Sequence, residues 1–566
     1  MKLIFVEYLS SLKERGELDV IMPDLLSEIG WSVISRPAIG TKQLGVDVAA
    51  IGTNEGGSKT LHLISIKSGN LRRSDWDSGE QSLRPSLNQI QDAYIPNHIP
   101  SRYRDLPVCI VLCIGGELHE SVQAEVYGYI DKRESPCLSF EVWTGDRISD
   151  LMLSGVLREK ALPNTWRSDF RKALALVDEP DAGTMHFRRF VASIADGCRA
   201  TRPSRLTAIR QIYIGLWTLF VWGRESGNTE SGYLCSEYSV LVGWSLVKDQ
   251  LEGGSKGARQ LWQSMKRLLH LHMLITEDYI DRYVARRAKA RHGLSAAVPS
   301  RESLDVNLRL FDLLSRVSLQ GIWSFWVARI GGVREETEKA FQDKIHRLTE
   351  LVVDMVQNNP ILVTPIKDDQ AIDINIACLF LRMVGCHRFI KGWIGQIARA
   401  TVYAFQTNGA FPCMYRDYHD LIERPEGDSE YRVRATRGSI LVPTLAVWAA
   451  LTEDTETLGI LADFASEPFK HSTLQLWYPG DDSEDHMYRG NDDHGLAATN
   501  IKIVRSCGAM LSPIRAECDA SCAFQSLSAI RRRLWPLVIA ASRHHRMPVP
   551  PQFWAVNETK SGTSQD

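Results

Sequence analysis

Apolar and polar positions follow two different patterns along this chain, and the change falls near residue 160. Before it, short apolar runs typical of strands alternate with stretches of helical spacing. From Leu18 to Ile29 the apolar side chains recur at helical intervals, and Gly30 ends that helix. The expected strands are Trp31–Ser35, Gly45–Ile51, Leu61–Lys67, Val108–Ile114 and Leu138–Trp143, and the other expected helices are Asn88–Tyr94, Glu120–Ile130 and Asp146–Met152.

This order of elements predicts an α/β domain with a mixed sheet flanked by helices. Gly- and Asn-containing residues 52–57 separate the two runs Gly45–Ile51 and Leu61–Lys67, a pattern that favours a β-hairpin. The run Val108–Ile114 is almost wholly apolar and is followed by two glycines. Such a run is typical of a strand that is covered on both faces.

From about Thr165 onward the strand signals nearly vanish and helical spacing dominates. The expected helices are Leu206–Trp222, Ala258–Leu274, Thr337–Gln357, Ile372–Val384, Phe389–Thr407, Ile440–Leu461 and Ser526–Ser542. No fixed repeat period indicates a solenoid. We therefore expect an α/β domain over residues 1–163, a large all-α domain over 164–556 that senses, regulates or assembles, and a flexible tail over 557–566.

Composition bears on whether the protein binds nucleic acid or a membrane and on the cell compartment in which we expect it. The net charge of −2 gives no global argument for nucleic acid or membrane, so any basic surface must be local. The longest apolar stretch, Ile212–Trp222, is shorter than the roughly 20 residues that span a bilayer. The eleven cysteines have no disulfide or zinc-ribbon spacing and are expected to be reduced core residues. We expect a cytoplasmic protein without membrane contact.

The residues that carry the most chemical information are Asp47 and Lys67, at the edges of the hairpin runs. A carboxylate can hold Mg²⁺, and a neighbouring lysine can steady a phosphate or help to activate water. Either residue alone is usually a solvated edge or turn position. Together, in this order, they indicate a site suited to phosphodiester hydrolysis.

Four segments make residues 1 to about 160 resemble the PD-(D/E)xK superfamily, the restriction-endonuclease-like nucleases. They are Leu25–Trp31 at the end of the first helix, Leu44–Val48, Ile64–Lys67, and Phe140–Ile148 at the closing strand and helix. The nearest likeness is to the Mrr-type branch found in bacterial restriction and anti-phage systems. The resemblance implies a restriction-endonuclease-like α/β fold and metal-dependent cleavage of DNA.

The same resemblance assigns roles to individual residues. Asp47 would ligate Mg²⁺ (or Mn²⁺), Ile66 would offer its backbone carbonyl, and Lys67 would position or activate the attacking water. Ser65 stands where the family usually has a second acid, and a hydroxyl is a weaker ligand for Mg²⁺ than a carboxylate.

A compensating acid is expected from the first helix. Asp19 is the favoured candidate, with Glu17 next. Asp24 and Glu28 are also available, although Glu28 lies near the helix end and is expected to face solvent.

Basic residues suggest where a nucleic acid could bind. Arg72 and Arg73 follow the strand that carries Lys67 and could clamp DNA phosphates, and Trp76 could stack on a base or pack beneath the loop. In the densest basic run Arg282, Arg286 and Lys289 would share one helix face. Each group could instead be an ordinary solvated surface.

The segment Trp477–Gly495 gathers acids and two histidines between aromatic residues. Its spacing matches no metal motif, and contact with a partner or effector stands beside an ordinary surface loop as its interpretation. No phosphate-binding Gly-rich loop with Lys-Ser or Lys-Thr occurs, so the chain is not expected to be its own ATPase.

The sequence thus predicts a Mg²⁺-dependent endodeoxyribonuclease that acts in restriction or anti-phage defence. The alternative is a non-catalytic protein with a nuclease fold that binds or scaffolds, together with a partner such as a separate ATPase. A homo-oligomer is compatible with either function.

Overall fold

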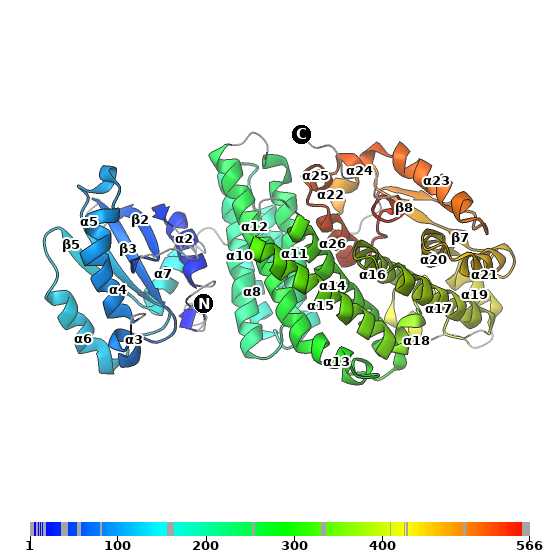
Figure 1. Ribbon diagram of the computed structural model, residues 1–566, viewed down its shortest axis with the longest axis horizontal. Coiled ribbons are helices and arrows are strands. Elements are labelled where there is room, and N and C mark those ends of the chain that lie inside the picture. The colour runs from blue at the N-terminus through cyan, green and yellow to red at the C-terminus, as the bar shows by residue number, and fades with distance from the viewer. Residues whose placement is uncertain are drawn as a thin grey trace. The chain divides into compact units, whose positions relative to one another are not determined.

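The computed structural model describes most of the 566-residue chain (Figure 1). The described residues are 5–6, 9–10, 12, 14, 18–35, 44–53, 58–79, 82–154, 164–251, 255–329, 335–407, 409–423, 425, 428–490 and 494–556. The expected tail over 557–566 and residues 54–57 of the expected turn over 52–57 lie outside them.

The N-terminal region contains a five-stranded sheet in the order β1-β2-β3-β4-β5. Its strands are β1 Ser32–Ser35, β2 Val48–Thr53, β3 Lys59–Lys67, β4 Val108–Ile114 and β5 Leu138–Trp143. Strand β3 pairs antiparallel with β2 and parallel with β4, and β4 pairs parallel with β5. The sheet is therefore mixed, as the order of elements predicts.

Helices accompany this sheet (Figure 1). One face of the sheet shares a buried apolar core with α3 Arg73–Asp77, α4 Leu83–Gln89 and α6 Glu120–Asp131. Helix α2 Asp19–Glu28 contacts β1 and β2, and α7 Gly145–Ser154 contacts β5. Every residue of β4 is buried, which confirms the prediction of a strand covered on both faces. Between α4 and β4 the chain forms η2 Ile90–Tyr94, α5 Ile95–His98 and η3 Ser101–Tyr103.

Helices dominate the remainder of the chain, as the change of pattern near residue 160 predicts. They are α8 Asn164–Ala175, α9 Pro180–Asp196, α10 Arg202–Glu225, α11 Glu230–Val247, α12 Lys256–Ile280, α13 Arg286–Ala288, α14 Ser303–Arg329, α15 Glu335–Asn358, α16 Ala371–Met383, α17 His387–Gln406, α18 Tyr418–Ile422, α19 Ser429–Ala435, α20 Leu441–Leu451, α21 Thr455–Ser466, α22 Ser483–His486, α23 Cys507–Ala520, α24 Cys522–Ser526, α25 Ser528–Arg531 and α26 Pro536–His545. Short η segments are η4 Lys248–Gln250, η5 Asp281–Ala285, η6 Ser295–Ala297, η7 Pro360–Val363, η8 Asp368–Gln370 and η9 Pro551–Phe553.

Two of the expected long helices are each divided in two. The expected helix Ile440–Leu461 is interrupted between α20 and α21, where Glu453 has a left-handed φ of 52°. The expected helix Ser526–Ser542 is interrupted between α25 and α26, where Arg533 has a φ of 58° and Pro536 begins the next helix. The apolar spacing continues through both breaks, so it does not reveal them.

Short strands also occur in the helical region. Strand β6 Gly438–Ser439 pairs with β7 Thr473–Leu474, and β8 Leu476–Tyr478 pairs with β9 Leu496–Ala498. The sequence did not indicate them, since two or three residues are too few to show a period.

The chain divides into two compact units. Unit 1 contains residues 1–239 and 250–268, and unit 2 contains residues 240–249 and 269–566. The sheet lies in unit 1. Among the described residues, no helix is both long and apolar enough to cross a membrane.

Candidate active site

The turn before β2 brings Asp47 against β3. Gly45 in this turn has a left-handed φ of 82°, and a Cβ atom there would lie 2.2 Å from the carbonyl oxygen of Ser86. Only glycine fits this position without a shift of the backbone. The amide of Asp47 donates to the carbonyl of Ile64 at 2.9 Å, and Asp47 Oδ2 accepts from the amide of Ile66 at 2.8 Å.

The bond between Ile66 and Asp47 fixes which groups share this edge of β3. The amide and carbonyl of one strand residue point to the same side, so the Ile66 carbonyl also faces the side where Asp47 lies. The side chains of Ser65 and Lys67 both point to the opposite face from that of Ile66. The Lys67 ammonium acts electrostatically on Asp47, so both charged groups lie near the Ile66 carbonyl at the carboxyl end of β3.

Lys67 is held by a carboxylate from the beginning of the chain. Its Nζ lies 3.2 Å from Oε1 and 3.1 Å from Oε2 of Glu14. The two side chains are 16% and 32% exposed, so this pair is partly shielded from water and remains reachable by a ligand. A second charged group is thus fixed beside Asp47.

The electrostatics of Asp47 reflect this crowding. Its pKa is raised to about 6, chiefly by burial; the carboxylates of Glu14 and Asp19 also raise this pKa, whereas the Ile66 amide and the Lys67 ammonium lower it. Three carboxylates with one ammonium leave an excess of negative charge in a partly buried place. Hard oxygen donors arranged in this way suit a divalent cation such as Mg²⁺.

The structure brings several of the predicted site residues together. Asp47 and Lys67 meet as expected, and Asp19 acts electrostatically on Asp47. Ser65 is only 2% exposed. Glu17 and the side chain of Glu28 lie outside the described residues, so their predicted roles are untested. Asp24 is buried and forms an ion pair with Arg267 within unit 1, which explains why it is not part of the site.

Glu14 is the site residue that sequence reasoning missed. It lies four residues before Leu18, seven before Ile21 and eleven before Leu25, which are all buried. Extending the helical spacing of these apolar residues towards the N-terminus would have placed a carboxylate on the same face. A charged residue on an apolar face is the signal that could have found it.

The first basic group lies next to the site in sequence. Arg72 and Arg73 are exposed at the start of α3, and Arg73 pairs with Glu125 at 3.2 Å. Trp76 is 1% exposed and packs edge-on against Tyr129 at 5.5 Å. Of the two interpretations of Trp76, packing beneath the loop is therefore confirmed and stacking on a base is wrong.

The second basic group belongs to unit 2. Arg282, Arg286 and Lys289 are exposed, and Arg282 pairs with Asp278 at 2.7 Å. Arg282 lies in η5 and Arg286 in α13, while Lys289 follows the end of that helix. A role for these residues in binding nucleic acid stays a prediction.

The segment Trp477–Gly495 is tied into unit 2 by a carboxylate. Glu484 in α22 accepts hydrogen bonds from the amide of Ser528 at 2.8 Å and from the hydroxyl of Tyr488 at 3.1 Å. The rings of His486 and His494 stack with centroids 5.8 Å apart. These contacts give Glu484 a structural role in the fold.

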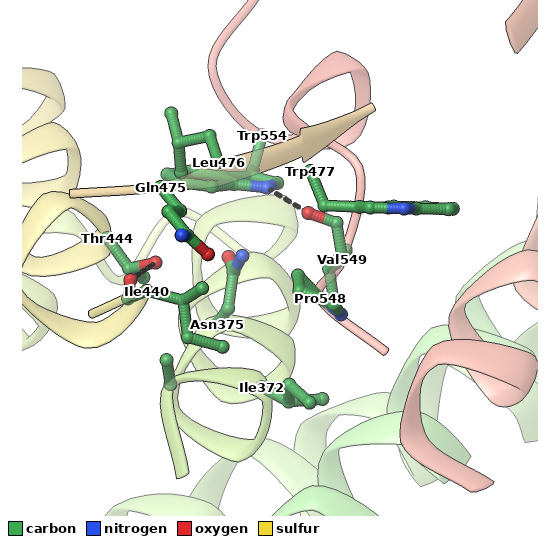
Figure 2. Close-up of a pocket in the computed structure, with 11 residues that line it drawn as sticks. Ile372, Asn375, Ile440, Thr444, Gln475, Leu476, Trp477, Pro548, Val549 and Trp554 are labelled. Carbon is green, nitrogen blue, oxygen red and sulfur yellow. Dashed lines mark hydrogen bonds between the residues drawn. The ribbon is translucent and has the colours of Figure 1, made fainter. Parts of the chain in front are cut away.

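Two hollows lie among the described residues of unit 2. Asn375 and Gln475 line a cavity of about 10 Å³. Figure 2 shows them near Trp554, whose indole donates to the carbonyl of Val549. This volume suits a single water molecule. A wider hollow of about 510 Å³ includes Asp368, whose carboxylate accepts from the amide of Ile440 at 2.7 Å. That carboxylate is therefore engaged at the start of α20.

Comparison with known proteins adds no assignment. No protein-family model, no curated protein and no solved structure matches this chain. The functional argument therefore depends on the residues of the site.

Proposed function

We propose that the α/β region of unit 1 is a metal-dependent endonuclease of the restriction-endonuclease-like kind, which hydrolyses phosphodiester bonds in DNA. The observation that supports this most directly is the arrangement at the carboxyl end of β3. There Asp47 is bonded to the Ile66 amide, and Lys67 is paired with Glu14.

The donor set fits the cation that this reaction requires. Asp47, Glu14 and the Ile66 carbonyl would hold Mg²⁺ or Mn²⁺, with Asp19 adding negative charge. All are oxygen donors, and their mutual repulsion is relieved when a cation binds. A bound divalent cation lowers the pKa of water and offsets the charge that builds up on the phosphate.

Glu14 removes a difficulty raised by Ser65. Nucleases of this family usually have a second acid, and Ser65 occupies that position in the strand. Glu14 supplies a carboxylate beside Lys67 from a different part of the chain. Loss of the acid at position 65 is therefore compatible with an active site.

Lys67 would act on the attacking water or on the phosphate. Its ammonium lies beside the Glu14 carboxylate, where it can orient the attacking water or contact a phosphate oxygen. Hydrolysis joins the water oxygen to phosphorus and breaks the bond to the leaving sugar oxygen. Arg72 and Arg73, exposed just beyond β3, would hold the DNA backbone.

The wider setting of this activity rests on the resemblance to restriction and anti-phage nucleases. In that setting the helices of unit 2 would sense a signal or assemble the protein. A separate ATPase and a second copy of the chain are the partners proposed.

Cleavage of plasmid DNA by the purified full chain tests the proposal. We expect cleavage with Mg²⁺ or Mn²⁺ and none after chelation. Asp47→Asn, Lys67→Met and Glu14→Gln should each lower the rate by roughly 100-fold or more, since each removes a group that acts on the metal or the water.

Exposed residues of α6 and of the position after it provide matched controls. Asp131→Asn and Lys132→Met remove the same charges from surface positions and should cleave at the wild-type rate. Wild-type rates in Lys67→Met would show that the site is wrongly assigned. Retained DNA binding without cleavage under either metal would favour the non-catalytic scaffold instead.

A further inference from the structure

Three ligand-type side chains meet on the sheet away from the Asp47 site. His62 of β3, Cys109 of β4 and Glu141 of β5 each place one ligand atom within 4.8 Å of the other two. His62 and Cys109 are direct partners in the parallel register, and Ser139 is the partner of Cys109 on β5. Glu141 lies two residues beyond Ser139, so all three side chains are on one face of the sheet.

This cluster is distinct from the candidate active site. His62 lies five residues before Lys67 on β3, a separation of roughly 16 Å along a strand. The two side chains also point to opposite faces of the sheet, because their positions differ by an odd number. The two sites share no residue.

Neighbouring groups orient two of the three ligands. His62 Nδ1 lies 3.2 Å from the carbonyl oxygen of Thr60. A carbonyl only accepts, so Nδ1 carries the proton and Nε2 keeps the lone pair that a metal ion could take. Glu141 Oε2 accepts from Trp143 Nε1 at 2.7 Å, which leaves its other oxygen for a ligand. Histidine and carboxylate ligands of metals are usually oriented by such bonds.

Aromatic rings cover one side of the cluster. The ring of Trp31 lies 4.0 Å from that of His62 and 5.7 Å from that of Trp143. Gly52 makes this packing possible, since a Cβ atom there would lie 2.3 Å from the Trp31 ring. His62 and Cys109 are buried, whereas Glu141 is exposed. Water can therefore reach the cluster from the Glu141 side.

We propose that His62, Cys109 and Glu141 bind one transition-metal ion of the zinc class, with water as the fourth ligand. One nitrogen, one sulfur and one oxygen ligand with an open position suit Zn²⁺ or Co²⁺, whereas Mg²⁺ prefers oxygen ligands alone. Ligand atoms around tetrahedral zinc are roughly 3.3–3.8 Å apart. Side-chain rotations that move the ligand atoms by about 1 Å would therefore complete the site. Binding forms the metal–sulfur bond and releases the thiol proton to solvent.

Spectroscopy with Co²⁺ tests this proposal on the metal-stripped full chain. We expect one equivalent of Co²⁺ to give the near-ultraviolet charge-transfer band of a cobalt–thiolate bond, and Zn²⁺ in equal amount to abolish it. Excess Mg²⁺ should leave the band unchanged. Cys109→Ser should lose it, while Cys137→Ser, which removes an exposed thiol from the same unit, should keep it.

Two further variants keep the test decisive. Glu141→Gln changes an exposed side chain that can still accept from Trp143, and it should weaken Co²⁺ binding by at least tenfold without a change in folding. Asp47→Asn should retain the band, so failure of the nuclease assignment and failure of this site are separable. A Co²⁺ spectrum without a thiolate band, or a band that survives in Cys109→Ser, would overturn the proposal.

Discussion

Asp47 occupies a position that is unfavourable for an isolated carboxylate. It is held beside β3 by its bond to the Ile66 amide, yet burial and the carboxylates of Glu14 and Asp19 oppose its ionisation. Perturbed carboxylates of this kind are characteristic of sites that bind a cation or transfer a proton.

This environment predicts how stability depends on pH. The pKa of Asp47 rises from 3.8 to about 6 in the folded protein, so the folded state holds that proton more tightly. The resulting stabilisation is fully present below pH 3.8 and is lost as the pH rises through 6. Asp47→Asn should therefore be more stable than wild type by about 1–3 kcal/mol at pH 8, with little difference at pH 4.

Hydrogen exchange of the β2 and β3 amides, without divalent metal, measures this difference at several pH values. Asn keeps an oxygen that can accept from Ile66, so the fold is preserved. Asp131→Asn is the control, because its exposed carboxylate should give no pH-dependent difference. Equal stability of Asp47→Asn and wild type at pH 8 would contradict the assignment of Asp47 as a strained carboxylate.

At the scale of elements, the local apolar pattern predicts the bounds of buried strands but does not predict single contacts between residues far apart in the chain. Strands β4 and β5 begin and end where their apolar patterns do, because a strand buried against neighbours needs apolar residues throughout or in alternation. The meeting of Asp47 with Lys67 was predictable from the hairpin. The helical spacing marks Glu14 as a charged residue on an apolar face, but its pairing with Lys67, 53 residues away, depends on the tertiary fold and is not predictable from the local pattern.

The break between α20 and α21 shows why some boundaries escape detection. Both helices are apolar enough to be read as one, and the interruption depends on a left-handed residue, Glu453, followed by a cap. Asp454 accepts from the amide of Thr457 at 3.2 Å and from its hydroxyl at 2.6 Å. This local chemistry starts a new helix regardless of the apolar period.

Removing that cap should destabilise α21. Asp454→Ala loses the acceptor for the first-turn amide, at a cost of about 1–2 kcal/mol, whereas Asp454→Asn keeps an acceptor and should cost less. Faster hydrogen exchange of α21 amides in the alanine variant alone is the expected result. Equal exchange in both variants would mean that the side chain of Asp454 does not set the boundary.

At the scale of the whole molecule, the division into two units separates the candidate catalysis from the helices of unit 2. The residues of the Asp47 site all belong to unit 1, whereas Arg282, Arg286 and Lys289 belong to unit 2. If the α/β region is the metal-dependent nuclease proposed above, Mg²⁺ should act first on unit 1. Stabilisation by a ligand is confined to structure that must be intact for the ligand to bind.

Hydrogen exchange with and without Mg²⁺ measures this effect across the chain. At a Mg²⁺ concentration about 100 times its Kd, the free energy of opening rises by about 2.7 kcal/mol, which slows exchange about 100-fold. We expect this protection in peptides containing β2 and β3 and none in α14 or α16 of unit 2. Asp47→Asn should abolish it, while Cys109→Ser should retain it, because Mg²⁺ does not use a thiolate. Protection that appears in unit 2 alone, or that persists in Asp47→Asn, would place the magnesium site elsewhere.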